Sequence, residues 1–390
     1  MLSVEKKIVL IGSSSFPGVG QGISSYCSEL VDVFNDKGWE VHVACPNANV
    51  IDTRFKLIVS NPNGNLKSEI SRLIQYSKEE KVTLIINNDN PYVQSIAPYI
   101  NVKFISVCHM NRTSVMSLSY YNEAYLSRVV AISKDMHSKL NTLVNDSNKL
   151  KLVYNAVKDT GYNSDSNITS QNKLKIMYCG GSNENKGISY IRNICSHFSG
   201  SDKVEISLYG NYSKSDLSFF NSFSCVIMHG KIPREQLISQ MYLYDCLLFP
   251  SRVEGCPVTI IEALSKGVIV ITSDGKGAMK ELVPFERFVL PLKLWDVAAI
   301  KMIYHIMEQE NIEELRSASR NKYEREFTTD IMYNALVDKL DLNSNIKKGR
   351  VGVFLKWHRQ IRKNNKASIL DRLCIKFGFL RKKKILLNWH

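Results

Sequence analysis

Residues 246–281 read CLLFPSRVEGCPVTIIEALSKGVIVITSDGKGAMKE, and the order of elements in this stretch indicates the fold class. The apolar run CLLFP predicts a buried strand, a Gly-Cys-Pro turn follows it, and Thr259–Ser265 has helical spacing. A second apolar run, Val268–Thr272, predicts the next strand. Strand, helix and strand in this order predict a parallel sheet with right-handed crossovers.

The same alternation extends through most of the chain. Apolar, β-branched runs predict six strands in the first half and five in the second, separated by stretches of helical spacing such as Gly22–Lys37. The strands are expected at Lys7–Ile11, Glu40–Ala44, Lys56–Val59, Val82–Ile86, Val102–Val107, Arg128–Ile132, Leu174–Tyr178, Val204–Leu208, Cys225–Met228, Asp245–Pro250 and Val268–Thr272. The fold class is therefore α/β, with two Rossmann-like units.

The two units imply a domain plan. We expect an N-terminal domain at residues 1–160, a polar linker without periodicity at 161–172, and a second domain at 173–327. A terminal helix at 328–342 is expected to return to the N-terminal domain. Two such domains face each other across a cleft, and open α/β sheets bind ligands at the carboxyl ends of their strands.

Composition places the chain among ordinary globular proteins. None of its nine cysteines forms a C-x-x-C pair or another metal-like spacing, so reduced core thiols and no metal site are expected. The first residues, MLSVEKKIVLIGSSS, lack a signal-peptide pattern, and no apolar window is long enough to span a bilayer. A cytoplasmic location follows as an expectation.

The net charge of +14 is concentrated at the C-terminus. Residues 344–390 contain 14 Lys or Arg and one acid, Asp371, which leaves +1 for the rest of the chain. A neutral body gives no support to nucleic-acid binding by the main fold. Amphipathic stripes with aromatics in residues 343–390 suit an anionic membrane surface, and a solvated tail or an RNA contact is the alternative.

The loop between CLLFP and the following helix carries the chemistry. A strand–loop–helix junction leaves backbone N–H groups unpaired and directs the positive end of the helix dipole at the loop, which suits anions without a metal. Glu254 lies in this loop and Glu262 lies eight positions later in the helix. A loop carboxylate can accept from sugar hydroxyls, and a helical one from a ribose diol.

This stretch resembles the signature of the retaining glycosyltransferase family 4, which has the two-Rossmann-domain GT-B fold. The family's motif is Glu-x7-Glu in the context E-G-F-P-x-x-x-x-E-A, followed by G-x-P-V-V and a later glutamate. The resemblance implies that Glu254 and the backbone of Gly255, Cys256, Pro257 and Val258 contact the donor sugar, and that Glu262 holds the ribose. The matching residues are Glu254-Gly255-Cys256-Pro257, Glu262-Ala263, Gly267-Val268-Ile269-Val270 and Glu281.

The loop CGGSNENKG, residues 179–187, is similar to the family's G-R-x-x-x-x-K-G loop. Lys186 occupies the position of the diphosphate-binding lysine, whose compact charge suits a leaving phosphate. Gly181, however, stands where the family has arginine. Arg252 and Lys276 are the candidates to supply the missing charge.

The resemblance also extends to the first half and covers residues 7 to about 340. Gly20 and Gly22 resemble the glycine loop whose backbone approaches the donor diphosphate, where a Cβ would obstruct. His109, at the end of a strand, matches the histidine that faces the donor sugar. The weaker matches are Ser133 and Asn155.

The resemblance implies transfer of a sugar from a nucleotide-diphosphate-sugar to a glycan or lipid-linked acceptor, with retention and without cofactor or metal. His109, Lys186 and Glu254 are the expected catalytic residues. The class of pathway is bacterial surface polysaccharide assembly, at the inner face of the plasma membrane. The alternatives are a non-catalytic GT-B partner subunit, a nucleotide-sugar epimerase and a phosphorylase; the Glu-x7-Glu context disfavours the epimerase, and the lack of a cofactor-lysine site disfavours the phosphorylase.

Overall fold

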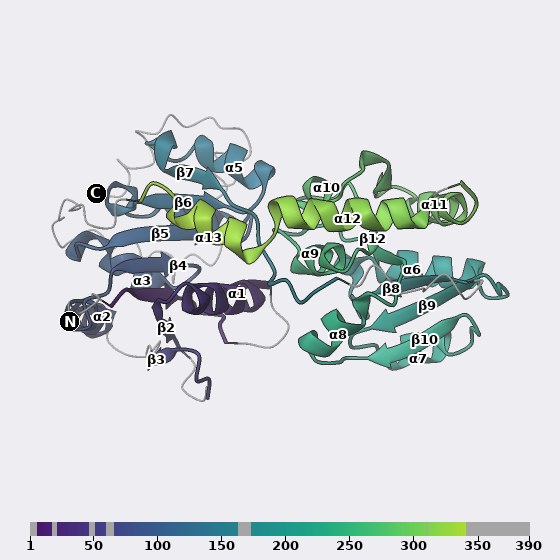
Figure 1. The fold of residues 1–390 in the computed structure, drawn as a ribbon, viewed down its shortest axis with the longest axis horizontal. Helices are drawn as coiled ribbons and strands as arrows, with labels where there is room; N and C mark the ends of the chain where they lie inside the picture. Colours follow the sequence, from purple (N-terminus) through teal and green to yellow (C-terminus); the bar gives the residue numbers. More distant parts are fainter. Residues whose placement is uncertain are drawn as a thin grey trace. The chain divides into compact units, whose positions relative to one another are not determined.

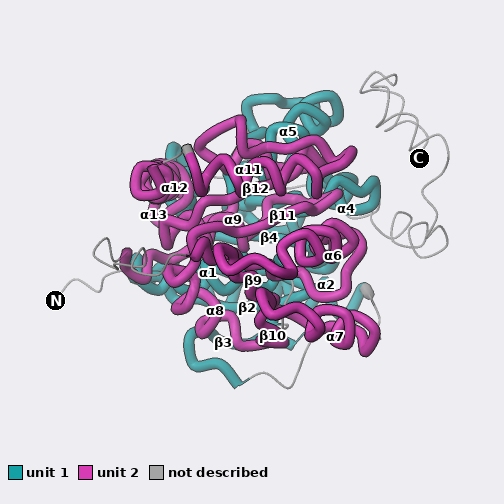
Figure 2. The backbone as a smooth tube through the Cα atoms, turned by 90° about the vertical axis from the view of Figure 1, so that its right-hand side faces the viewer, with its two compact units in different colours: residues 1–154, 332–390 teal, residues 155–331 magenta. Residues whose placement is uncertain are grey.

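The computed structural model describes residues 6–17, 22–46, 51–59, 66–162, 173–309 and 311–340. The chain forms two compact units (Figure 2). One contains Met1–Tyr154 and Met332–His390, and the other contains Asn155–Ile331. Gly20 and the tail at residues 343–390 lie outside the described residues.

The first unit is built on a parallel sheet of seven strands, in the order β3-β2-β1-β4-β5-β6-β7 (Figure 1). The order reverses between β1 and β4, because β2 and β4 flank β1 on opposite sides. Its strands are β1 Ile8–Gly12, β2 Glu40–Cys45, β3 Lys56–Val59, β4 Leu84–Asn87, β5 Lys103–Cys108, β6 Arg128–Ala131 and β7 Leu150–Leu152. Its helices are α1 Gly22–Asp36, α2 Leu66–Glu79, α3 Pro91–Ile96, α4 Thr113–Tyr120 and α5 Lys134–Asn141, with 3-10 turns η1 Ala97–Tyr99, η2 Glu123–Tyr125 and η3 Ser147–Lys149.

The last helix, α13 (Thr329–Val337), packs on this first sheet beside β6 (Figure 1). The last carbonyls of a helix have no partner within it. Here the guanidinium of Arg128 on β6 donates to the carbonyls of Ala335 and Leu336, both at 2.7 Å. The Trp39 indole donates to the Tyr333 hydroxyl at 3.0 Å. Buried donors thus fix the chain's return to its first unit.

The second unit contains a parallel sheet of six strands, in the order β10-β9-β8-β11-β12-β13. This order also reverses, at β8 and β11. Its strands are β8 Leu174–Tyr178, β9 Val204–Tyr209, β10 Val226–Gly230, β11 Cys246–Phe249, β12 Ile269–Ser273 and β13 Val289–Leu290. Its helices are α6 Ile188–His197, α7 Lys214–Phe220, α8 Arg234–Met241, α9 Val258–Ser265, α10 Met279–Leu282, α11 Trp295–Gln309 and α12 Ile312–Glu326, with 3-10 turns η5 Glu184–Lys186 and η6 Glu286–Phe288.

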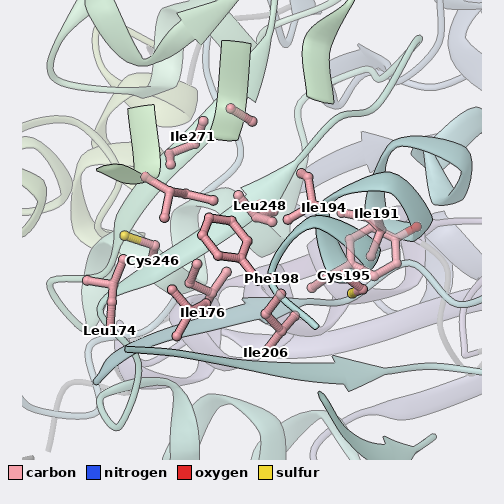
Figure 3. Close-up of a cluster of buried hydrophobic side chains, with 14 of the residues drawn as sticks. Leu174, Ile176, Ile191, Ile194, Cys195, Phe198, Ile206, Cys246, Leu248 and Ile271 are labelled. Carbon is pink, nitrogen blue, oxygen red and sulfur yellow. The ribbon is translucent and has the colours of Figure 1, made fainter. Parts of the chain in front are cut away.

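The core of the second unit lies between its sheet and α6 (Figure 3). Ile176, Leu248 and Ile271 come from three neighbouring strands and are fully buried. On α6, Ile191 and Ile194 meet them from one helical face. The opposite face of the sheet is also buried, as Met177 and Leu247 show, which explains why these strands are apolar throughout.

The structure confirms the α/β class with two Rossmann-like parallel sheets. All eleven predicted strands are present, shifted by at most two residues at either end. The sequence pattern does not predict β7 and β13, because strands of three and two residues carry too little periodicity. The eight described cysteines are free, and all but Cys179 are buried.

Candidate functional site

Two loops meet at the carboxyl edge of the second sheet. Residues 179–187 follow β8, and residues 250–257 follow β11, the neighbouring strand. From β8 the chain continues to β9 on one side, whereas β11 leads to β12 on the other. This is the topological switch point, where connections diverge and open α/β sheets bind ligands. Both predicted donor loops of this unit therefore lie at the position that the topology favours.

Lys186 and Glu254 face each other across these loops and form an ion pair. The Glu254 carboxylate also accepts from the Ser251 hydroxyl at 2.5 Å, and the Lys186 ammonium lies 5.5 Å from the centre of the Phe249 ring. The Glu254 side chain is 14% exposed and that of Lys186 37%. A cation and a hydrogen-bond acceptor are thus adjacent at this edge of the sheet.

Backbone contacts join the loop at 250–257 to the loop after β8 and to the segment after β12. The Arg252 N–H donates to the Asn185 carbonyl at 2.8 Å, and the Glu254 N–H donates to the Lys276 carbonyl at 2.8 Å. Gly277 makes the second contact feasible, because a Cβ there would lie 1.9 Å from the Glu254 carbonyl oxygen and its φ is +112°. The loop that holds Glu254 therefore requires glycine at a distant position.

The next feature is the start of α9, which follows directly on this loop. Pro257 occupies the N-cap position, and no described side chain caps the helix. The Asn155 side-chain amide donates to the Cys256 carbonyl at 2.6 Å, and both residues are buried. Burial raises the pKa of the Cys256 thiol to about 12, so the thiol stays neutral. This hydrogen bond from Asn155 fixes the backbone of the Gly255–Val258 segment, which is predicted to contact the donor sugar.

Glu262 lies inside α9 and is 4% exposed. Its carboxylate accepts from the Arg234 guanidinium, with Nε 2.6 Å from Oε1. Arg234 is the first residue of α8, where a cation opposes the helix dipole. The Glu262 carboxylate offsets the unfavourable interaction between Arg234 and the helix dipole. The ion pair also holds the loop after β10 close to Glu262, the residue predicted to bind the ribose. No sequence pattern points to Arg234 as the partner of Glu262, because 28 positions separate the two residues.

Gly181, at the family's arginine position, has a backbone that disfavours a side chain. Its φ is +57°, and a Cβ would lie 2.4 Å from the Asn211 carbonyl oxygen. The loop thus follows a path that excludes arginine. Of the two candidates to replace that charge, Arg252 is exposed with its guanidinium 5.9 Å from the centre of the Tyr190 ring, and Lys276 is exposed beside the Glu254 loop.

In the first unit, the corresponding edge lies at β1, β4 and β5. His109 follows β5, is 5% exposed, and has Nε2 2.9 Å from Oδ1 of Asn88. Burial lowers the pKa of His109 to about 4, and the nearby Asp89 carboxylate opposes this shift. The imidazole is therefore neutral near pH 7.

A polar run that sequence analysis passed over, residues 87–90 (NNDN), organises this edge. Asn90 caps α3, Asn88 donates to the Gly12 carbonyl at 3.3 Å, and Asn87 donates to Gln94 at 2.8 Å. Asp89 accepts from the Ser13 hydroxyl at 2.9 Å, the Ser14 N–H at 2.7 Å and the Ser15 hydroxyl at 2.6 Å. Four consecutive polar residues that begin at the last residue of a buried strand are the signal that could have found it.

The remaining predicted residues occupy defined positions. Gly22 is the first residue of α1 and follows the undescribed residues 18–21, which include Gly20. Ser133 caps α5, with its hydroxyl 3.2 Å from the Met136 N–H. This contact gives Ser133 a structural role.

Within the described residues, no group of three or more His, Cys, Asp or Glu side chains could hold a metal ion. Among those same residues, none of the helices has the length and apolarity needed to cross a membrane.

The second unit is similar to a known family of domains. Residues 159–325, which lie within the second unit, match the family model "Glycosyl transferases group 1". No curated protein matches the chain.

Solved structures match both units together. They include a glycosyltransferase from Rickettsia africae (15% identity, TM-score 0.67, 86% of this chain and 100% of that one) and HepE from Anabaena, solved with UDP and glucose (15%, 0.65, 86% and 99%). A third is the apo form of the lipopolysaccharide outer core galactosyltransferase WaaB (16%, 0.63, 86% and 100%). At these identities the likeness shows the fold, which is GT-B.

Proposed function

We propose that the chain is a retaining glycosyltransferase of family 4 that moves a sugar from a nucleotide-diphosphate-sugar to a glycan or lipid-linked acceptor. The observation that carries the proposal is the contact between Lys186 and Glu254 at the switch point of the second sheet. The group 1 family match over residues 159–325 supports it independently.

Each residue has a role in this proposal. Lys186 and the amino end of α9 stabilise the negative charge that develops on the departing diphosphate. Glu254 accepts hydrogen bonds from sugar hydroxyls, and the backbone between Gly255 and Val258 fixes the sugar's orientation. Glu262 accepts from the ribose diol, and its contact with Arg234 holds the carboxylate in place.

The proposed mechanism is same-face displacement. The acceptor hydroxyl attacks the anomeric carbon from the side that the diphosphate leaves, and the leaving phosphate takes the acceptor's proton. Such a step needs no protein nucleophile, metal or cofactor, so catalysis consists of positioning and leaving-group stabilisation. The cluster around Lys186 and Glu254 supplies groups of that kind.

The proposed acceptor and pathway draw on two structural matches and on the charge of the C-terminal residues. WaaB is a lipopolysaccharide galactosyltransferase, and another structural match, WaaG, is a glycosyltransferase of lipopolysaccharide biosynthesis. We place this chain in surface polysaccharide assembly at the cytoplasmic face of the membrane. The basic residues at 344–390, with net charge +13, would bring it to anionic lipid.

One observation favours a second candidate. Gly181 stands where the family has arginine, and the loop geometry excludes a side chain there. A chain that has lost this charge fits a non-catalytic partner subunit that binds a nucleotide sugar without turning it over.

Binding and turnover by the purified full-length chain test both candidates. UDP-glucose, UDP-galactose and GDP-mannose are each added, and the melting temperature and slow donor hydrolysis are measured. We expect one donor to raise the melting temperature and to be hydrolysed. Stabilisation without hydrolysis or transfer favours the partner subunit, and no stabilisation across a wide panel of nucleotide sugars rejects both.

A further inference from the structure

Asn88 and His109 form a buried contact that determines both the orientation of the imidazole and which of its nitrogens carries the proton. Asn88 follows β4 and His109 follows β5, and these strands are neighbours in the first sheet. Asn88 is 2% exposed and His109 5%. The Tyr26 ring of α1 meets the imidazole edge-on, with centroids 4.8 Å apart. The ring plane is therefore held from two sides.

The second contact of Asn88 decides which atom faces the histidine. Its Nδ2 lies 3.3 Å from the carbonyl oxygen of Gly12, which can only accept a hydrogen bond. The amide nitrogen must therefore point at Gly12, and Oδ1 points at His109. Exchanging the two atoms would place oxygen against oxygen at Gly12 and two N–H groups against the imidazole.

An amide oxygen also only accepts. The atom opposite it, Nε2 of His109 at 2.9 Å, must therefore carry a proton. Burial lowers the pKa of His109 to about 4, so the ring carries one proton at neutral pH. With that proton on Nε2, the lone pair lies on Nδ1.

We infer that Asn88 is a positioning residue that locks His109 in the Nε2–H tautomer, so that Nδ1 accepts a hydrogen bond from a sugar hydroxyl. The inference rests on the proposed function for its ligand, but the tautomer itself does not. A histidine of this form cannot donate to a phosphate from Nδ1 and brings no positive charge to the site.

The groups around the imidazole agree with this assignment. Asp89, in the loop after β4, is the carboxylate that acts on it and favours protonation. Asp89 is committed to Ser13, Ser14 and Ser15, while Tyr26 presents its ring and Cys108 is a buried neutral thiol. Converting Asn88 into a second carboxylate would change this balance, because it would lie in direct contact with Nε2.

The experiment uses the full chain with ¹⁵N-labelled histidine. Long-range ¹H–¹⁵N spectra report the tautomer of each imidazole, and His109→Gln assigns the signal among the eight histidines. We expect the Nε2–H pattern for His109, unchanged between pH 5.5 and 8. In Asn88→Asp, we expect the His109 ring to carry two protons at pH 6 and to lose one of them as the pH is raised.

The same variant is assayed by hydrolysis of whichever of UDP-glucose, UDP-galactose or GDP-mannose stabilises the wild type. We expect kcat/KM of Asn88→Asp to be at least tenfold lower at pH 6 and to recover as pH rises, whereas the wild type shows no such ionisation. Asn88→Ala should lower kcat/KM at every pH alike.

Three results would overturn the inference: an Nδ1–H pattern in the wild type, titration of His109 between pH 5.5 and 8, or an Asn88→Asp spectrum identical to that of the wild type. If a variant does not fold, the wild-type spectrum alone still decides the tautomer. If the tautomer is as stated but no nucleotide sugar binds, the proposed function fails and the role of Asn88 in setting the ring stands.

Discussion

Lys186 and Glu254, separated by 68 positions in the sequence, form an ion pair where the loops after β8 and β11 meet. The pair joins the residue proposed for the leaving diphosphate to the residue proposed for the sugar. Because each side chain restrains the other, both are held in place before a ligand arrives. Such preorganisation is what stabilisation of developing charge requires.

The first prediction concerns these two residues. Removing an interaction of this kind costs about 2.7–4 kcal/mol of transition-state stabilisation. Lys186→Ala and Glu254→Ala should therefore each lower kcat by roughly a hundredfold or more. Since the side chains contact each other, the double variant should lose less than the product of the two single losses. Steady-state kinetics with the donor that binds the wild type measures all three.

A suitable control is Lys203→Ala, because Lys203 is exposed and precedes β9 at the opposite edge of the same sheet. Its kcat should equal that of the wild type. Near-normal rates for both Lys186→Ala and Glu254→Ala would reject the assignment of the site.

The second prediction is that restoring the family's arginine at Gly181 fails. The φ of +57° and the 2.4 Å approach to the Asn211 carbonyl oppose any Cβ. Gly181→Arg should therefore lower the free energy of unfolding by more than about 1 kcal/mol and should not increase turnover. Thermal unfolding measures this, with Gly200→Arg as the control, because Gly200 has open space around its Cβ position. A stable and faster Gly181→Arg enzyme would show that the loop adapts.

The sequence was sufficient for local features of the fold. Apolar runs such as Leu174–Tyr178 are buried on both faces, so their pattern is strong, and their edges were found almost to the residue. Two-residue strands such as β13 are formed by tertiary pairing, here with β12, and leave no local pattern. Lys186 and Glu254 were predicted from two separate motifs. That the two side chains contact each other follows only from the strand order, which places β8 beside β11.

What the sequence did not reveal are partners that are distant along the chain. Arg234 meets Glu262 and Asn155 meets Cys256, the latter across 101 positions. No periodicity or spacing encodes such pairs, because they depend on which loops the sheet order brings together. Gly181 is the inverse case: its identity was a visible departure from the motif, but its reason, the Asn211 carbonyl, was visible only in three dimensions.

A third prediction tests Arg234. Arg234→Ala removes a partner of a buried carboxylate, which typically costs about 1–3 kcal/mol of stability. Donor binding should weaken by about tenfold or more, equivalent to about 1.4 kcal/mol. Adding Glu262→Gln should restore part of the stability, because the carboxylate charge is gone, but not the binding. Chemical unfolding and calorimetric titration separate the two effects. Unchanged affinity in Arg234→Ala would limit Arg234 to a structural role.

The fourth prediction follows from the lowered pKa of His109, about 4 against an ordinary value of 6.5. Between these values the unfolded chain binds one proton more than the folded chain, so stability rises with pH in this window and is lost as pH falls through it. Above pH 6.5 the group makes no further difference. From pH 7 to pH 5, this single group should remove about 2 kcal/mol.

The measurement is urea unfolding of the wild type and His109→Gln at both pH values. The wild type should lose more stability than the variant on acidification, by about the stated amount. Equal losses in the two proteins would mean that His109 titrates normally in the folded state.

The last prediction concerns the basic residues at 344–390, which lie outside the described structure. Each Lys or Arg near an anionic surface contributes about 1 kcal/mol, and the attraction falls within a Debye length of about 8 Å at physiological salt. The full chain should therefore sediment with phosphatidylserine-containing vesicles at low salt. It should be released at about 0.5 M salt, because the Debye length is then much shorter. A chain ending at Leu342 should stay in the supernatant and keep its donor hydrolysis, because the residues proposed for donor binding all precede residue 343. Vesicle binding equal to that of the full chain would show that the tail is not the membrane contact.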